Sequence, residues 1–290
     1  MSKVTINRDL CEKCGTCVLS CPETVFIQKE NKSIPDLIHE DLCVSCGHCV
    51  AICPKEAINH TDFPRDSVNP INRDILPSKE QIFESIKTRR SIRAFRDKPV
   101  EKDLIEQIID GARYAPSGHN AQSTEFVVVQ EKESLKTICE LTHLFLSKTV
   151  KQLRNPLIKK FLLMVAKHEI EGALHLLDDF DRIVNEFNKG KDTILFSAPC
   201  ALFFHADKSI NFSDVNSSLA VQNAMLLCHS IGLGCFYAGY VVSACKRDSS
   251  IPRLLSIPNT HQIYGALAIG YPKFKYKKWI ERRPAKIQWR

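Results

Sequence analysis

The chain has 290 residues, with 40 Lys and Arg against 33 Asp and Glu, 13 cysteines and a formal net charge of +7. At roughly 150 residues per domain, this length predicts two domains. Hydrophobic residues make up 44% of the chain and charged residues 25%, which excludes a disordered or fibrous protein. The longest apolar runs are interrupted by polar residues or glycines, which argues against a membrane-spanning helix. The N-terminus lacks the apolar stretch of a secretory signal. We therefore expect a cytoplasmic protein whose cysteines serve metal or redox chemistry.

Eight of the thirteen cysteines lie between Cys11 and Cys53, in two runs with the same spacing. Each run reads Cys-x-x-Cys-x-x-Cys-x-x-x-Cys-Pro, and the second run repeats the first 32 residues later. This is the bacterial ferredoxin spacing, in which the fourth cysteine of each run binds the other cluster. The sequence therefore predicts two [4Fe–4S] clusters, one held by Cys11, Cys14, Cys17 and Cys53 and the other by Cys43, Cys46, Cys49 and Cys21.

Structural zinc is the alternative for these cysteines. Zinc sites typically use two separated Cys-x-x-Cys pairs, which leaves the third cysteine and the repeated Cys-Pro unexplained. Short apolar pieces at 4–9, 25–28 and 57–61 predict strands around the two runs. A unit of about 60 residues this polar buries little core, so we expect the clusters to hold it together. The five remaining cysteines, scattered from Cys139 to Cys245, are expected in a core.

Beyond these runs the sequence predicts a linker and a larger second domain. Three prolines at 64, 70 and 77 mark residues 63–78 as an extended linker. Ser78 and Gln81 form a candidate capping box for a helix that ends near Arg89. Further helices are expected at 101–115, through most of 132–195 and at 213–231, and strands at 125–130, 199–207, 234–240 and 261–271. Strands separated by long helices predict an α+β fold for residues 79–290, after a small two-cluster domain at 1–62.

Two segments of the second domain carry a chemical signal. The first contains Arg89, Arg90, Ser91 and Arg93, whose guanidinium groups and hydroxyl suit a phosphate. The alternative is a solvated helix end with cations near its negative pole. The second segment is the turn at 115–122, where Asn120 offers both a donor and an acceptor. Taken alone, this turn is an ordinary loop.

In this order the two segments resemble the nitroreductase family of FMN enzymes. Supporting pieces follow in the family's order: Gln222-Asn223 in a long helix, Gly232-Leu233-Gly234, the run 268–272, and a basic tail with Arg282 and Arg283. The resemblance covers residues 79–290, and the whole chain resembles the ferredoxin–nitroreductase fusions of anaerobic microbes. It implies an α+β fold with a central, mostly antiparallel sheet flanked by helices. It also implies an intertwined homodimer with one FMN per subunit.

The resemblance also assigns FMN-binding roles to particular residues. Arg89, Arg90, Ser91 and Arg93 would hold the phosphate and the ribityl chain, and Asn120 would bond the flavin ring. Tyr237, Ala238 and Gly239 would lie over the isoalloxazine, and Arg282 or Arg283 would reach the phosphate. No catalytic side chain is assigned, because the flavin itself carries the chemistry.

The function that we expect is an iron–sulfur flavoprotein oxidoreductase. Electrons would pass between the clusters and FMN to reduce a small electrophile such as a nitroaromatic, a quinone or an enone. The donor would be NAD(P)H or a reduced ferredoxin-type protein. Two alternatives stay open: a non-catalytic electron carrier for a partner protein, and a flavin enzyme of the same fold that performs reductive dehalogenation or flavin fragmentation.

Other binding functions find less support in the sequence. Residues 1–62 carry a net charge of −3 and residues 63–290 a net charge of +10, a division that does not suggest a nucleic-acid partner. The tail 273–286 holds seven basic residues, but a tail that wraps a dimer explains them equally well. Gly232, Gly234 and Gly239 do not match a dinucleotide-binding motif.

Overall fold

The computed structural model describes residues 3–290, and these group into two compact units. The first unit runs to Pro77 and includes the short segment Gly118–Ala121. The second unit consists of Ser78–Ser117 and Gln122–Arg290. Within residues 3–290, no helix combines the length and the apolar character needed to cross a membrane.

The first unit is built from two short antiparallel strand pairs and two short helices. Strand β1 (Val4–Ile6) pairs with β4 (Ile58–His60), and β2 (Phe26–Ile27) pairs with β3 (Asp36–Leu37). Helices α1 (Thr16–Ser20) and α2 (His48–Ile52) repeat the 32-residue spacing of the cysteine runs. The strands predicted at 4–9, 25–28 and 57–61 are confirmed, whereas two-residue β3 escaped prediction because it has no periodicity to detect. The apolar core of this unit is small, as its polar composition predicts.

Between β4 and the next helix the backbone has only two single 3₁₀ turns, at Arg65–Ser67 and Arg73–Ile75. Helix α3 (Lys79–Thr88) then opens the second unit. The Ser78 hydroxyl accepts the Gln81 backbone N–H at 3.3 Å, and the Gln81 side chain accepts the Ser78 N–H at 2.8 Å. The predicted capping box is therefore confirmed, and the helix ends directly before Arg89.

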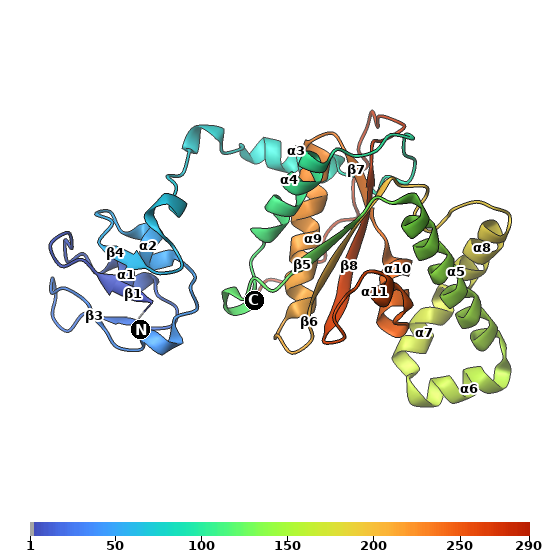
Figure 1. Ribbon diagram of the computed structural model, residues 1–290, viewed down its shortest axis with the longest axis horizontal. Helices are drawn as coiled ribbons and strands as arrows, with labels where there is room; N and C mark the ends of the chain where they lie inside the picture. Colours follow the sequence, from blue (N-terminus) through green and yellow to red (C-terminus); the bar gives the residue numbers. More distant parts are fainter. Residues whose placement is uncertain (1–2) are drawn as a thin grey trace. The chain divides into compact units, whose positions relative to one another are not determined.

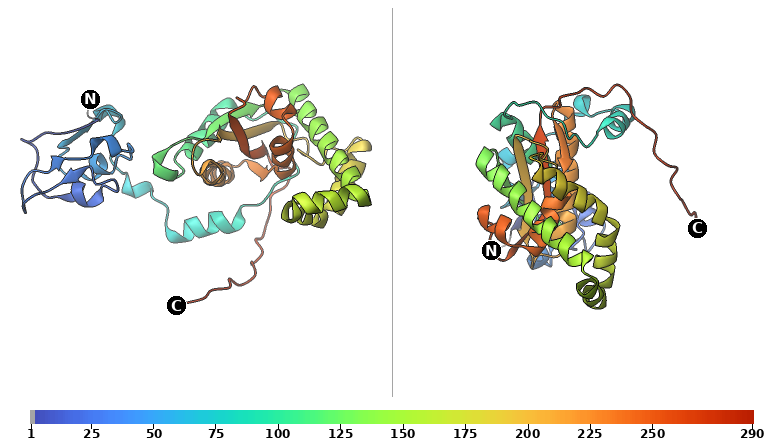
Figure 2. Two further views of the ribbon diagram at one scale, coloured as in Figure 1. Left: turned by 90° about the horizontal axis from the view of Figure 1, so that it is seen from below. Right: turned by 90° about the vertical axis from the view of Figure 1, so that its right-hand side faces the viewer.

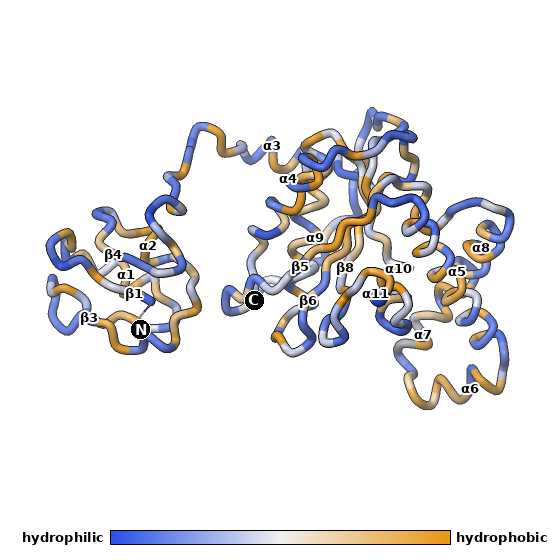
Figure 3. The backbone as a smooth tube through the Cα atoms, viewed as in Figure 1, coloured by the Kyte–Doolittle hydropathy of each residue, from blue (hydrophilic) through white to orange (hydrophobic). Residues whose placement is uncertain are grey.

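The second unit is organised around a four-stranded antiparallel sheet in the order β5-β6-β8-β7 (Figure 1). Its strands are β5 (Glu125–Val129), β6 (Cys200–Asp207), β7 (Gly234–Tyr237) and β8 (His261–Gly270). Side chains of β6 alternate between two cores: Phe203 belongs to one, and Leu202 and Phe204 to the other. Both faces of the sheet are therefore buried, and the tube of Figure 3 is apolar along these strands.

Helices cover the two faces of this sheet (Figure 1). On one face lie α4 (Lys102–Arg113) and α9 (Ser213–Ser230), which pack on each other. Around the other core lie α5 (Lys132–Arg154), α8 (Leu177–Asn188), α10 (Gly239–Arg247) and α11 (Ser250–Leu254). Helices α6 (Pro156–Val165) and α7 (Lys167–His175) connect α5 to α8. The predicted α+β class, with a mostly antiparallel sheet between helices, is confirmed.

One predicted strand needs correction. The strand predicted at 234–240 ends at Tyr237, and α10 begins at Gly239. Tyr237 and Tyr240 favour a strand by propensity. Val241, Val242, Ala244 and Cys245 are nevertheless buried with helical spacing, so packing overrides that preference.

An extended segment joins the first helix of this unit to the sheet edge. The Ile92 N–H donates to the Cys235 carbonyl at 3.0 Å, and the Arg96 N–H donates to the Tyr271 carbonyl at 2.9 Å. Beyond Tyr271 the chain forms no helix or regular strand and runs out as an extended tail (Figure 2). The segment that carries the predicted phosphate ligands is thus fixed along the edge strand β7.

Candidate functional site

Two small cavities in the first unit are lined by the predicted cluster ligands. Four cysteines line each cavity, and in both cases one of the four comes from the other run. The first cavity is lined by Cys11, Cys14, Cys17 and Cys53, and the second by Cys21, Cys43, Cys46 and Cys49. The structure therefore brings together the two predicted tetrads, including the exchange of the fourth cysteine.

Backbone and side-chain donors surround these sulfur atoms. The Cys53 Sγ accepts the Ala57 N–H at 3.2 Å, and at the equivalent place in the repeat the Cys21 Sγ accepts the Val25 N–H at 3.4 Å. The Nε2 of His60 lies 3.5 Å from the Cys43 Sγ. Hydrogen bonds to ligand sulfurs are one of the means by which proteins set cluster potentials.

The electrostatics of the tetrads favours a bound cationic core. Burial, together with the neighbouring Cys46, Cys43 and Cys21, raises the pKa of Cys49 to about 11. Burial likewise raises the pKa of Cys17, with Cys11 and Cys14 adding to the effect. Four thiolates this close repel one another unless iron neutralises them. The residues present fit two [4Fe–4S] clusters.

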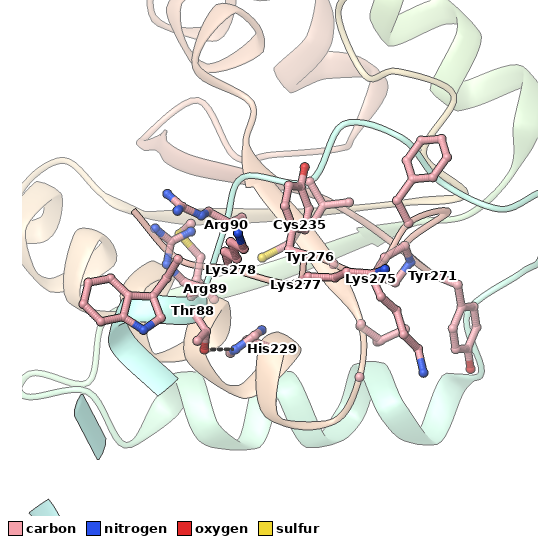
Figure 4. Close-up of a pocket in the computed structure, with 18 of the residues that line it drawn as sticks. Thr88, Arg89, Arg90, His229, Cys235, Tyr271, Lys275, Tyr276, Lys277 and Lys278 are labelled. Atoms are coloured by element: carbon pink, nitrogen blue, oxygen red, sulfur yellow. Dashed lines mark hydrogen bonds between the residues drawn. The ribbon is translucent and has the colours of Figure 1, made fainter. Parts of the chain in front are cut away.

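In the second unit, a cavity of about 570 Å³ lies beside the end of α3 (Figure 4). Thr88, Arg89 and Arg90 line it from the α3 side, and Cys235 lines it from β7. The tail contributes the basic residues Lys275, Lys277 and Lys278. Among the described side chains, Arg89 has a buried Nη1 atom without a hydrogen-bond partner.

An unpaired guanidinium nitrogen inside a basic cavity favours binding of an anion. A buried donor without a partner costs about 1–3 kcal/mol of stability, and a charged donor costs more. A hydrogen bond to a phosphate oxygen removes that cost. His229 does not add charge here, because burial and the nearby Arg89 both lower its pKa. Its Nε2 lies 2.9 Å from the Thr88 Oγ1 (Figure 4). The residues around Arg89 therefore fit the phosphate of FMN.

A second cavity of about 670 Å³ is lined by four more of the predicted flavin residues. Arg93, Tyr237, Ala238 and Gly239 all line it. The guanidinium carbon of Arg93 lies 5.2 Å from the centroid of the Phe236 ring, a cation–π contact that fixes the side chain. The Tyr237 hydroxyl donates to the Tyr264 carbonyl at 3.0 Å. The lining is largely apolar and aromatic, and its charged side chains are Arg93, Arg182, Lys246 and Asp179, a combination that suits a flat polar ring.

The structure places the remaining predicted residues elsewhere. Ser91 is exposed and forms a parallel β-bridge with Cys235. In sequence it lies between Arg90, which lines the first cavity, and Arg93, which lines the second. Asn120 lies in the segment that groups with the first unit, where its amide donates to the Ser45 carbonyl at 2.6 Å. Arg282 and Arg283 are exposed in the tail and line neither cavity. The flavin roles of these residues stay predictions.

Sequence reasoning missed the lysines that line the Arg89 cavity. The signal was present in the basic tail, but the resemblance pointed to Arg282 or Arg283 rather than to Lys275, Lys277 and Lys278. It also missed Thr88 and His229, which contact each other although they lie 141 residues apart in sequence. No local pattern predicts such a contact.

Comparison with known proteins agrees with this division of the chain. The model of the nitroreductase family matches residues 86–271, and the model of a 4Fe–4S dicluster domain matches residues 3–66. A Methanothermobacter thermautotrophicus protein, provisionally named NADH dehydrogenase/NAD(P)H nitroreductase, is 30% identical over 67% of this chain and 79% of its own. The 4-nitrobenzoate reductase of Pseudomonas putida is 29% identical over 64% of this chain and 83% of its own.

A solved structure shows the same fold. The nitroreductase with bound FMN from Desulfitobacterium hafniense superposes with a TM-score of 0.54 at 17% identity. The match covers 71% of this chain and 97% of that protein. The chain therefore belongs to the nitroreductase family and carries a 4Fe–4S dicluster domain in front of its family domain.

Proposed function

We propose that the protein is an FMN oxidoreductase in which electrons pass between the two [4Fe–4S] clusters and the flavin to reduce a small electrophile. Nitroaromatics, quinones and enones are the acceptor class that we infer. One observation carries the proposal: the chain that holds two complete cysteine tetrads also holds an unpaired, buried guanidinium nitrogen in a basic cavity. When bound, the clusters exchange electrons singly whereas FMN can hold two, so the pair can connect a one-electron donor to a two-electron acceptor.

The protein's own residues have three tasks in this scheme. Arg89 binds the phosphate through its free Nη1, and the lysines of the tail add positive charge to the same cavity. Arg93, held against Phe236, places a positive charge beside the proposed ring site, where it favours a reduced, negatively charged ring. Tyr237 keeps its proton, because burial raises its pKa, and its hydroxyl is fixed on the Tyr264 carbonyl.

We infer that the protein acts as a homodimer. Large apolar side chains of the tail are exposed in the single chain, with Trp289 at 88%, Ile280 at 69% and Phe274 at 64%. An extended segment with this much exposed apolar surface is stabilised when a second subunit covers it. Asn120, which is not among the residues that line either cavity, would then complete a flavin site of the dimer.

The identity of the electron donor can be tested with a variant that lacks one cluster ligand. The names of the relatives point to NAD(P)H, whereas the cluster domain points to a reduced ferredoxin-type donor. In the anaerobically purified protein, both donors should support reduction of 4-nitrobenzoate, followed as loss of the nitro absorbance. Cys46→Ser should abolish turnover with reduced ferredoxin and leave turnover with NADPH, because FMN stays bound.

Two results would overturn the proposal. If Cys46→Ser leaves ferredoxin-driven turnover unchanged, the clusters are not on the electron path. If the reduced protein is reoxidised by a partner protein but by no nitroaromatic, quinone or enone, it is an electron carrier rather than an enzyme of this type. Analysis of products from halogenated phenols would reveal the reductive dehalogenation alternative.

A further inference from the structure

Three metal-ligating side chains lie on three neighbouring strands, apart from the cluster and flavin residues. Glu125 begins β5, His205 lies near the end of β6 and His261 begins β8. In the sheet register Glu125 is directly opposite His205, and His261 is opposite Asp207, two residues further along β6. Residues opposite each other, or two apart, share a face of a sheet, so the three side chains point to the same side.

An irregularity in strand pairing brings these three side chains close to one another. The register between β6 and β8 shifts between Phe204 and His205, an irregularity that omits Tyr264 from the pairing. Such bulges redirect neighbouring side chains. As a result, the Nδ1 atoms of His205 and His261 lie only 3.0 Å apart. One oxygen of Glu125 and a nitrogen of each histidine all lie within 4.8 Å of one another.

The spacing of the two histidine nitrogens matches that of the ligands of a divalent transition metal. Two nitrogens bound tetrahedrally to zinc at about 2.0–2.1 Å are about 3.3 Å apart, close to the observed spacing. Two imidazoles and one carboxylate are a common ligand set for zinc with one open position. Further helix packing is not needed to assemble the set, because all three ligands stand on hydrogen-bonded strands.

The surroundings also suit a bound metal. His205 is 4% exposed, so a metal held by its ring is shielded from solvent on that side. The Asp207 Oδ2 lies 3.8 Å from the Nε2 of His261, on the side of the ring away from His205. At that distance Asp207 makes no direct hydrogen bond to the ring, but its negative charge favours a cation bound at His261. Glu125 is exposed and leaves the metal a route in from solvent.

We propose that Glu125, His205 and His261 bind one Zn²⁺ ion, which joins strands β5, β6 and β8 and stabilises the second unit. None of the three residues lines either flavin cavity, so the proposal does not depend on the proposed redox activity. The competing interpretation is that the two histidines share one N–H···N hydrogen bond and bind no metal.

The test uses the full-length, anaerobically purified protein with its clusters and FMN in place. The protein is treated with EDTA, desalted, incubated with one and a half equivalents of Zn²⁺ and desalted again, and zinc and iron are then measured together. We expect about one zinc per chain with unchanged iron. Glu125→Gln and His261→Ala should each weaken zinc binding at least about tenfold. His168→Ala removes an exposed histidine elsewhere and should bind zinc as the parent does.

Zinc X-ray absorption distinguishes this site from the cysteines. Nitrogen and oxygen ligands at about 2.0 Å support the proposal, whereas sulfur ligands at about 2.3 Å would show that zinc has entered a cluster tetrad. The proposal is overturned if the parent protein retains no zinc, or if zinc is taken up only as iron is lost. Zinc binding that is unchanged in the exposed, near-isosteric Glu125→Gln variant and in His261→Ala would also overturn it.

Discussion

The backbone N–H of Ile92 donates to the carbonyl of Cys235 at 3.0 Å, and the side chain of Ile92 lies directly over Gly234. A Cβ atom on Gly234 would lie 2.7 Å from the Cγ1 of Ile92. The extended segment after Arg90 can therefore approach β7 only because residue 234 has no side chain. This approach positions Arg89 and Arg93, which line the two cavities.

Gly234→Ala should accordingly lower FMN affinity and stability together. The added methyl pushes Ile92 away from β7, at a cost of about 1–3 kcal/mol for overpacking. Gly172→Ala is the matched control, because nothing lies within 4 Å of a Cβ there and the residue is in α7. We expect the control to be neutral or up to about 1 kcal/mol more stable. Flavin fluorescence on dilution measures FMN affinity, and thermal unfolding measures stability. Equal FMN affinity and equal stability of the two variants would contradict the prediction.

Arg89→Ala should release FMN while the clusters remain. The variant loses the buried nitrogen that we assign to the phosphate, whereas the cysteine tetrads belong to the other unit. We expect FMN affinity to fall by at least about 10-fold, the loss of one charged hydrogen bond of about 1.5–3 kcal/mol. Arg113→Ala removes an exposed arginine paired with Asp110 and should keep both cofactors. Flavin and iron are measured on the same samples to test this prediction. Loss of iron with FMN retained would contradict the assignment of Arg89 to the FMN phosphate.

The exchange of the fourth cysteine between clusters can be tested by pairs of substitutions. The parent should hold about eight iron atoms per chain, four in each cluster. Cys21→Ser with Cys46→Ser alters one tetrad and should leave about four. Cys17→Ser with Cys21→Ser alters both and should leave almost none. If each run served its own cluster, the two double variants would show the opposite iron contents.

The five cysteines of the second unit should resist alkylation in the native protein. All five are buried, and burial raises the pKa of Cys200 and of Cys245 to about 12. Because the thiolate is the reactive form, about one thiol in 10⁴ is reactive at pH 8, and labelling should increase only as the pH approaches 12. Iodoacetamide labelling counted by mass spectrometry checks this, with Ser230→Cys on an exposed helix end as a positive control that gains one label. Rapid native labelling of Cys200 or Cys245 would show that the core opens.

Local patterns in the sequence determined the parts of this protein that short-range chemistry controls. The cysteine spacing predicted both tetrads, because three cysteines three positions apart can reach the same cluster, and in bacterial ferredoxins with this spacing the fourth cysteine binds the other cluster. The capping box at Ser78 and the helix end before Gly232, whose φ is +82°, follow from backbone donors and backbone freedom within a few residues. Continuous apolar runs likewise predicted central strands such as those at 125–130 and 199–207.

Contacts between residues far apart in the chain were decided only by the tertiary structure. The division of the flavin residues between two cavities depends on how the segment after Arg90 pairs with β7, a contact across about 140 positions. The meeting of Glu125, His205 and His261 depends on strand register and on one bulge, which shifts side chains by a single residue. Register is set by the packing of whole strands between two helical layers, so no short stretch of sequence contains that information.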